Sequence, residues 1–300
     1  MRRDHSSPRT RHTAGTSATA LALFVVASLV VACGQEGENG DDQLIVTVSI
    51  VPQAYFVAEV GGSLVSVNVM VEPGANPATY EPNASQMRAL SESDCYVSIG
   101  VPFEEAWLDR ISAANRGMVL VNSTTGVELR TFPNGVVDPH IWLSPRRVAM
   151  QAETIAQALI ELDPDHEAEY LANLERFQEE VEGLDVRIAE MLEPYSGEVF
   201  VVSHPSWAYF AEDYSLEMIP IEVGGQEPSA AELTDLVERA QREGVRVVFA
   251  QPQFSTEAAE IVADEIGGDV LLIDPLAEDW ALNLQDVAET MAGVLGNGLS

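Results

Sequence analysis

Short apolar runs alternate with amphipathic stretches along most of the chain from residue 44 onward. Apolar runs of about four to eight residues predict buried strands, whereas apolar positions three or four apart predict helices. The first part of the pattern predicts strands at residues 44–51, 65–71, 96–99 and 118–121, with helices at 55–60, 85–90 and 103–114. Strands that alternate with helices predict a parallel α/β sheet, whose ligands gather at the carboxyl ends of the strands.

The most regular stretch is residues 164–192, where apolar side chains recur at alternating spacings of four and three. This period predicts one continuous amphipathic helix. Asp163 is placed to cap its first turn, Pro164 suits the first helical position, and Pro194 with Gly197 ends it. At about 1.5 Å per residue the helix is about 43 Å long, which is enough to cross two lobes.

Strands and helices alternate again after this helix. The pattern predicts strands at residues 198–203, 217–221, 245–250 and 270–273, with helices at 207–214, 230–243, 255–266 and 283–295. Pro220 weakens the second of these strands, because proline donates no hydrogen bond to a sheet. The sequence therefore predicts an α/β fold with two parallel-sheet lobes, residues 44–163 and 196–300, joined by one backbone helix at 164–195.

The first 32 residues differ from the rest, because arginines precede an apolar run at 21–31 that is too short to span a bilayer. Val30-Val31-Ala32-Cys33 resembles the lipobox of bacterial lipoproteins, in which the cysteine is acylated. Residues 34–42 are polar, acidic and glycine-bearing, like a flexible tether. We expect a signal peptide at 1–32, lipidation of Cys33, a tether at 33–43 and an extracytoplasmic, membrane-anchored protein. The alternative is an ordinary signal peptide with a chance cysteine.

The formal net charge is −33, a balance that repels nucleic acid and anionic lipid head groups. Acidity of this size is also what a soluble secreted surface carries, so charge alone does not establish metal binding. The chain contains two cysteines, and acylation of one leaves Cys95 without a partner for an internal disulfide. Cys95 lies in an apolar strand, so we expect it to serve packing.

Histidine is scarce, and two of the five histidines lie in contexts that indicate a site. His140 follows a proline in a loop, and His204 stands at the end of the predicted strand 198–203, just before a helix. Asp274 has the same placement after the strand at 270–273. Two imidazoles and one carboxylate from strand ends and loops suit Zn²⁺ or Mn²⁺. Taken singly, each residue is weak evidence, because a lone histidine after a strand is more often a loop or capping residue and Asp-Pro is common in turns.

Several blocks in combination resemble the zinc- and manganese-uptake solute-binding lipoproteins of ABC importers over nearly all of residues 44–295. The matching blocks begin at Pro73-Gly74, Asp138-Pro-His-Ile-Trp, Ser203-His-Pro-Ser-Trp, Glu227-Pro-Ser, Gln251-Pro-Gln-Phe and Asp274-Pro-Leu. The resemblance implies that His140, His204 and Asp274 bind the metal in a cleft between lobes that move little. It also implies a non-enzymatic protein that delivers its metal to a membrane permease.

The first block departs from the family pattern. Members that bind manganese or zinc normally carry a histidine after its proline, whereas Pro77 is followed here by Ala78. Alanine offers no lone pair, so Asn76, Glu81 or a water would have to supply the missing ligand. An open position weakens discrimination among metals, and zinc is favoured only slightly over manganese.

Two further residues are candidates for supporting the site. Asp138 is placed to orient His140, although turn formation accounts for it equally well. Glu227 is expected chiefly to brace the helix that begins at residue 230, with direct metal contact as the lesser alternative.

Two rival functions remain open. A degenerate member of the same fold could have lost its metal and serve adhesion or another ligand, since Ala78 replaces the expected histidine. A zinc hydrolase would use the same three ligands and an open position, but no His-Glu-x-x-His or Gly-x-Ser-x-Gly motif is present. A tethered monomer is the expected state of a delivery protein.

Overall fold

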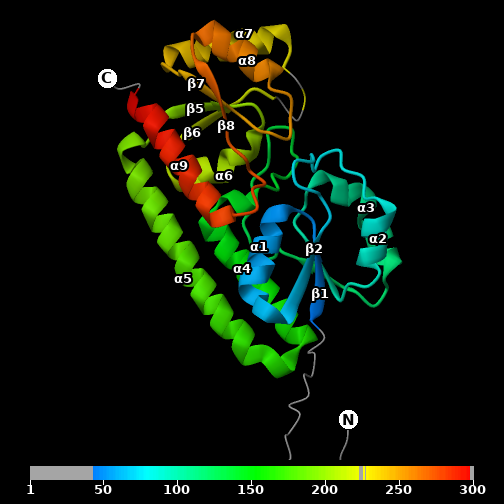
Figure 1. Ribbon diagram of the computed structural model, residues 1–300. Helices are drawn as coiled ribbons and strands as arrows, with labels where there is room; N and C mark the ends of the chain where they lie inside the picture. The colour runs from blue at the N-terminus through cyan, green and yellow to red at the C-terminus, as the bar shows by residue number, and fades with distance from the viewer. Residues whose placement is uncertain (1–42, 223–225, 227, 298–300) are drawn as a thin grey trace, which may run out of the picture. The chain divides into compact units, whose positions relative to one another are not determined.

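The computed structural model describes residues 43–222, 226 and 228–297. The predicted signal peptide, Cys33, nearly all of the tether and Glu227 lie outside these residues. Within the described part, two sets of alternating strands and helices are separated by a long helix, α5 (Glu167–Leu192), drawn in green in Figure 1. No helix in this part of the chain is long and apolar enough to cross a membrane.

The first sheet contains four parallel strands in the order β2-β1-β3-β4. These strands are β1 (Leu44–Val48), β2 (Val65–Val69), β3 (Cys95–Ser98) and β4 (Val119–Asn122). The helices that accompany them are α1 (Val51–Gly61), α2 (Ala84–Leu90) and α3 (Pro102–Ala114). Cys95 is buried in β3, as expected of a packing residue.

The second sheet repeats this topology in the order β6-β5-β7-β8, again with all strands parallel. Its strands are β5 (Val199–Val202), β6 (Glu217–Pro220), β7 (Val247–Ala250) and β8 (Asp269–Leu272). Its helices are α6 (Ala208–Asp213), α7 (Ala230–Arg242), α8 (Glu257–Ile266) and α9 (Trp280–Asn297). Pro220 lies in the edge strand, where its missing N–H needs no partner. The predicted fold class is therefore confirmed.

The sequence prediction omitted one helix, α4 (Pro145–Leu162), which precedes α5. Ser144 caps it, because its hydroxyl oxygen accepts a hydrogen bond from the backbone N–H of Arg147 at 3.2 Å. Pro145 occupies the first helical position, where a missing N–H is harmless. The buried residues Val148 and Ile155 face the core. Both start signals can be recognised in the sequence.

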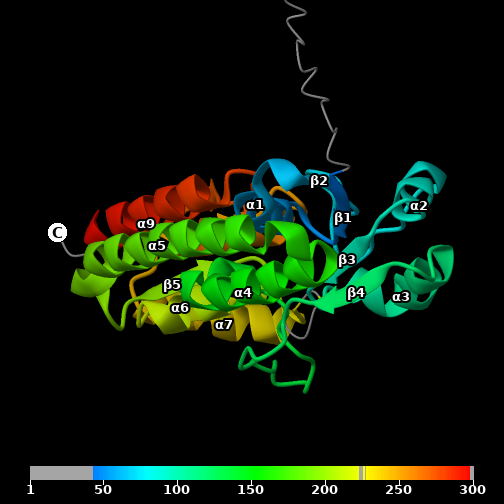
Figure 2. The same ribbon diagram turned by 90° about the horizontal axis from the view of Figure 1, so that it is seen from below.

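The predicted long helix is present, with a different start. A 3₁₀ turn at Pro164–His166 precedes α5, and Asp163 makes no side-chain capping bond, contrary to prediction. Its carboxylate instead accepts a hydrogen bond from the Tyr170 hydroxyl at 2.9 Å and contacts the His166 ring. Figure 2 shows α5 lying alongside α4 and α9, with which it packs.

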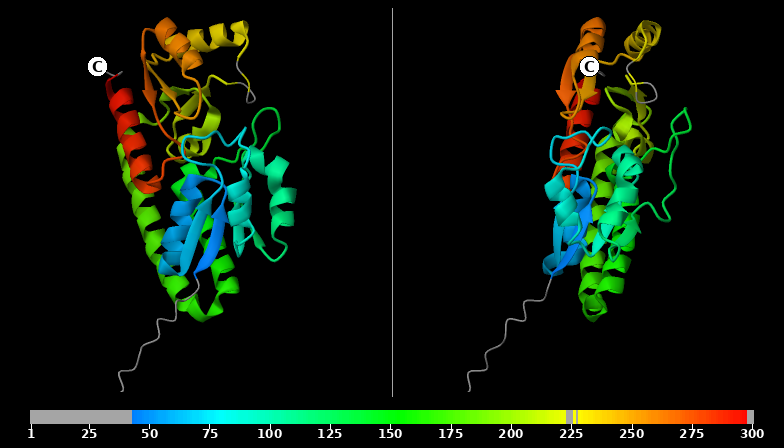
Figure 3. Two further views of the ribbon diagram at one scale, coloured as in Figure 1. Left: turned by 45° about the vertical axis from the view of Figure 1, so that its right-hand side comes forward. Right: turned by 90° about the vertical axis from the view of Figure 1, so that its right-hand side faces the viewer.

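The two sheets share one apolar core. In β5, Phe200 and Val202 face the cluster that also contains Val46 of β1, whereas Val201 faces a second cluster beneath α7 and α8. Figure 3 shows α7 and α8 beside the second sheet. Because the larger cluster is continuous across both sheets, a rotation of one against the other would disrupt close packing.

Candidate metal centre

His140 lies directly before a short 3₁₀ turn (Ile141–Leu143) that leads into α4. The buried carboxylate of Asp138 accepts a hydrogen bond from the His140 backbone N–H at 3.0 Å, and its Oδ1 lies 2.6 Å from His140 Nδ1. When Nδ1 donates its proton to this carboxylate, Nε2 carries the free lone pair of the ring. This contact fixes the orientation of the His140 ring, as carboxylates do for metal-binding imidazoles.

His204 follows β5, and its ring, like that of His140, has a carboxylate at Nδ1. Its Nδ1 lies 2.7 Å from Oε2 of Glu222, which follows the neighbouring strand β6. The ring stacks on Phe254, with 4.8 Å between centroids and 21° between planes. The carboxylate and the stacked Phe254 ring together fix the imidazole and leave the lone pair of Nε2 free to bind a metal.

The two imidazoles lie next to each other, with ring centroids 5.3 Å apart and planes at 73°. Burial lowers the pKa of His140, although the Asp138 carboxylate opposes this effect. A lowered pKa favours the neutral ring near pH 7, which is the form that binds metal. Two imidazole rings at this separation can bind one borderline cation.

Asp274 follows a strand of the same sheet as His204 but lies apart from the two histidines. It follows β8, and β7 lies between β8 and β5, so two strand spacings of about 4.8 Å separate it from the strand of His204. Its Oδ1 accepts hydrogen bonds from Gln253 Nε2 at 2.7 Å and from the Leu276 backbone N–H at 2.8 Å. In the described residues no group of three or more histidine, cysteine, aspartate or glutamate side chains forms a closed metal cluster.

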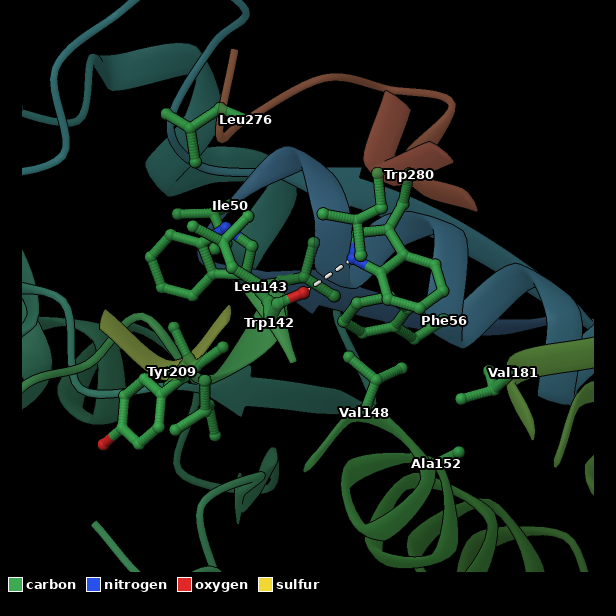
Figure 4. Packing of buried hydrophobic residues seen from close by; sticks show 14 of the residues in the cluster. Ile50, Phe56, Trp142, Leu143, Val148, Ala152, Val181, Tyr209, Leu276 and Trp280 are labelled. Atoms are coloured by element: carbon green, nitrogen blue, oxygen red, sulfur yellow. Dashed lines mark hydrogen bonds between the residues drawn. The ribbon is translucent and has the colours of Figure 1, made fainter. Parts of the chain in front are cut away.

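Two tryptophans connect the segment of His140 to the segment of Asp274. Trp142 Nε1 donates to the carbonyl oxygen of Pro275 at 2.7 Å, and Trp280 Nε1 donates to the carbonyl oxygen of Trp142 at 2.6 Å. The second of these hydrogen bonds is the dashed line in Figure 4. Both indoles are buried, so these bonds hold the two segments in fixed register.

The loop that contains Ala78 provides no obvious substitute ligand. The Ala78 backbone N–H donates to Asn76 Oδ1 at 2.8 Å, which commits that oxygen to a local turn. Pro77 is tied to α3, since its carbonyl oxygen accepts from the Phe103 backbone N–H at 3.2 Å. Glu81 is exposed to solvent. The structure brings neither Asn76 nor Glu81 into a described contact with the histidine pair.

Sequence reasoning missed three residues of the site, Glu222, Gln253 and Phe254. Glu222 follows β6 just as His204 follows β5, so the rule of strand carboxyl ends could have identified it. Gln253 and Phe254 belong to a block that carries the family resemblance, but the resemblance by itself implies no role for them.

Comparisons with known proteins agree on one family. The family described as "Zinc-uptake complex component A periplasmic" matches residues 46–294. The chain is 25% identical over 283 residues to the "High-affinity zinc uptake system protein ZnuA" of Bacillus subtilis, covering 85% of this chain and 88% of the relative. It is 26% identical over 257 residues to the "Manganese-binding lipoprotein MntA" of Halalkalibacterium halodurans, covering 83% and 85%.

A solved structure entitled "Crystal structure of ZnuA" superposes with a TM-score of 0.82. Its sequence identity to this chain is 49%, and the match covers 85% of this chain and 100% of that one. The likeness therefore extends across both sheets and the helix between them.

Proposed function

The chain belongs to the family of periplasmic components of zinc-uptake complexes, and on this premise we propose that it captures one divalent transition metal for an ABC permease. The observation that supports this proposal best is the facing pair His140 and His204, each with a carboxylate at Nδ1. Relatives with this fold include proteins named for zinc and for manganese.

The proposed ligands are Nε2 of His140, Nε2 of His204 and one oxygen of Asp274. Asp274 comes from a strand separated from that of His204 by β7, and the oxygen that it would contribute is Oδ2, because Oδ1 already accepts two hydrogen bonds. A water supplies the fourth position, because Ala78 offers no donor. Two imidazoles and a carboxylate favour zinc slightly over manganese, whose preferred ligands are mostly oxygen.

The protein acts by binding and delivery, without catalysis, as members of a solute-binding family do. Acylation of Cys33 holds it at the outer face of the cell membrane, and residues 33–43 form the tether. It works as a monomer that presents its metal to the permease. The adhesin alternative stays a prediction without a supporting contact in this structure.

The test is calorimetric titration of Zn²⁺ and Mn²⁺ into chelator-treated protein that lacks the residues before the tether. We expect submicromolar one-to-one binding. His140→Ala and His204→Ala should each weaken binding by about tenfold or more, because removing even an outer partner of a ligand costs that much. His166→Ala, in the turn before α5, is the matched control and should bind as the wild type does. Unchanged affinity in both site variants would contradict the proposal.

A further inference from the structure

The carboxylate of Asp274 is held from one side by a glutamine. Gln253, in the loop after β7, donates from Nε2 to Asp274 Oδ1 at 2.7 Å. The backbone N–H of Leu276 donates to the same oxygen at 2.8 Å. Within the described residues, Oδ2 of Asp274 accepts no hydrogen bond. The two oxygens of this carboxylate are therefore in different environments.

The two donors have a direct consequence for metal binding. A carboxylate oxygen has two lone pairs, and two N–H donors occupy both of those on Oδ1. Oδ2 retains its lone pairs, so Asp274 can offer a metal one oxygen without losing either hydrogen bond. Binding through both oxygens would require the Gln253 or the Leu276 contact to break.

The amide of Gln253 is kept in this orientation at a cost. Its Oε1 is buried and has no hydrogen-bond partner in the described structure. A buried carbonyl oxygen without a hydrogen-bond partner is destabilising. The opposite orientation would place Oε1 against the Asp274 carboxylate, where two acceptors repel each other. The contact with Asp274 therefore determines how this side chain is arranged.

We propose that Gln253 is a positioning residue that makes Asp274 a one-oxygen metal ligand and so biases the site toward zinc. This inference rests on the proposed function, in which Asp274 binds the metal beside His140 and His204. Four-coordinate zinc fits two imidazoles, one carboxylate oxygen and one water. Manganese favours more oxygen ligands, which a two-oxygen carboxylate would help to supply.

The test compares metal preference in Gln253→Leu with that in the wild type, using chelator competition for Zn²⁺ and Mn²⁺. Leucine fills a similar volume but removes the N–H donor, which frees one lone pair on Oδ1. We expect the ratio of the manganese to the zinc dissociation constant to fall by about tenfold. The visible spectrum of bound Co²⁺ should also lose the intensity typical of four-coordination, a change that a purely structural defect would not produce.

Gln241→Leu is the matched control. Its Nε2, in α7, donates to the Glu265 carbonyl oxygen of α8 at 2.8 Å in an exposed contact between two helices, so its loss should leave the metal ratio unchanged. Gln253→Asn, which withdraws the amide by one methylene, replaces the leucine variant if thermal melting shows that the latter is unfolded.

The outcomes separate the two proposals. If Gln253→Leu lowers both affinities by the same factor and leaves the Co²⁺ spectrum unchanged, the positioning role is overturned while metal capture stands. If the wild type binds neither metal, both proposals fail.

Discussion

The two sheets have the same strand order, but the polar side chains at their carboxyl ends differ in how far other groups hydrogen-bond to them. At the first sheet, the Ser49 hydroxyl after β1 donates a hydrogen bond to the carboxylate of Glu104 in α3, which also accepts hydrogen bonds from the backbone N–H groups of Ile99 and Gly100. In the second sheet, Nε2 of His204 and Oδ2 of Asp274 accept no hydrogen bond from the described residues. In the described residues, the carboxyl end of the second sheet therefore presents unused lone pairs to a cation.

A cavity at the first sheet makes the contrast sharper. It has a volume of about 360 Å³ and lies at the ends of β3 and β4, with Leu108, Leu120 and Glu104 among its lining residues. Its one carboxyl group already has both oxygens engaged, and burial raises the pKa of Glu104. Equal topology therefore does not imply equal chemistry, because internal hydrogen bonds decide which groups remain free for a ligand.

The largest expected effect comes from removing the side chain that joins the two regions. Trp280 is buried and packs on Phe56 with centroids 5.2 Å apart. Trp280→Ala should lower the free energy of unfolding by about 3–5 kcal/mol, measured by urea denaturation, because a large cavity opens in the shared core. Leu282→Ala, at an exposed position of α9, should change it by less than about 0.5 kcal/mol. A loss of stability in Trp280→Ala as small as that in Leu282→Ala would mean that Trp280 does not support a shared core.

A smaller effect should follow from filling the site of the second sheet. Zinc at about a hundred times its dissociation constant should raise the free energy of unfolding by about 2.7 kcal/mol. His204→Ala should show much less stabilisation at the same zinc concentration in a thermal melt. Equal stabilisation of the two proteins would indicate that zinc binds elsewhere, for example to surface carboxylates.

Two matched glutamate variants compare the regions directly. Glu222→Gln should weaken zinc binding by about tenfold, because the carboxylate at His204 Nδ1 is lost, with little change in stability. Glu104→Gln should leave zinc affinity unchanged and cost about 1–3 kcal/mol of stability, because an amide cannot accept all of the present hydrogen bonds. Calorimetry and denaturation measured on both variants check this reversal. A loss of zinc affinity in Glu104→Gln would contradict it.

The smallest expected effect concerns Cys95 in the first sheet. Burial, with a smaller contribution from Asp94, raises the pKa of its thiol to about 12. At pH 8 the thiol therefore stays protonated and shielded, and only the thiolate reacts readily. The experiment uses protein without Cys33, so that Cys95 is its one thiol. A maleimide reagent should leave Cys95 unmodified in the folded protein and label it after denaturation. Rapid labelling of the folded protein would show that β3 opens easily.

The sequence by itself determined the alternation of strands and helices, the long helix and the two histidines. Each of these depends on local signals: apolar runs, a period of three and four residues, and polar residues placed just after strands. The family blocks added the expectation that His140, His204 and Asp274 act together. Even α4, which the predicted pattern does not include, has a local start signal at Ser144 and Pro145.

Only the tertiary structure decided which of these residues meet. Glu222 contacts His204 because β6 pairs with β5, and Gln253 contacts Asp274 because β7 pairs with β8. The same strand order inserts β7 between His204 and Asp274. Strand order depends on which crossovers pack best over the whole sheet, and the local pattern of a single chain does not encode it. For this reason the proposed ligands and the nearby Asp138 could be predicted from the sequence, whereas Glu222 and Gln253, which contact His204 and Asp274 from neighbouring strands, could not.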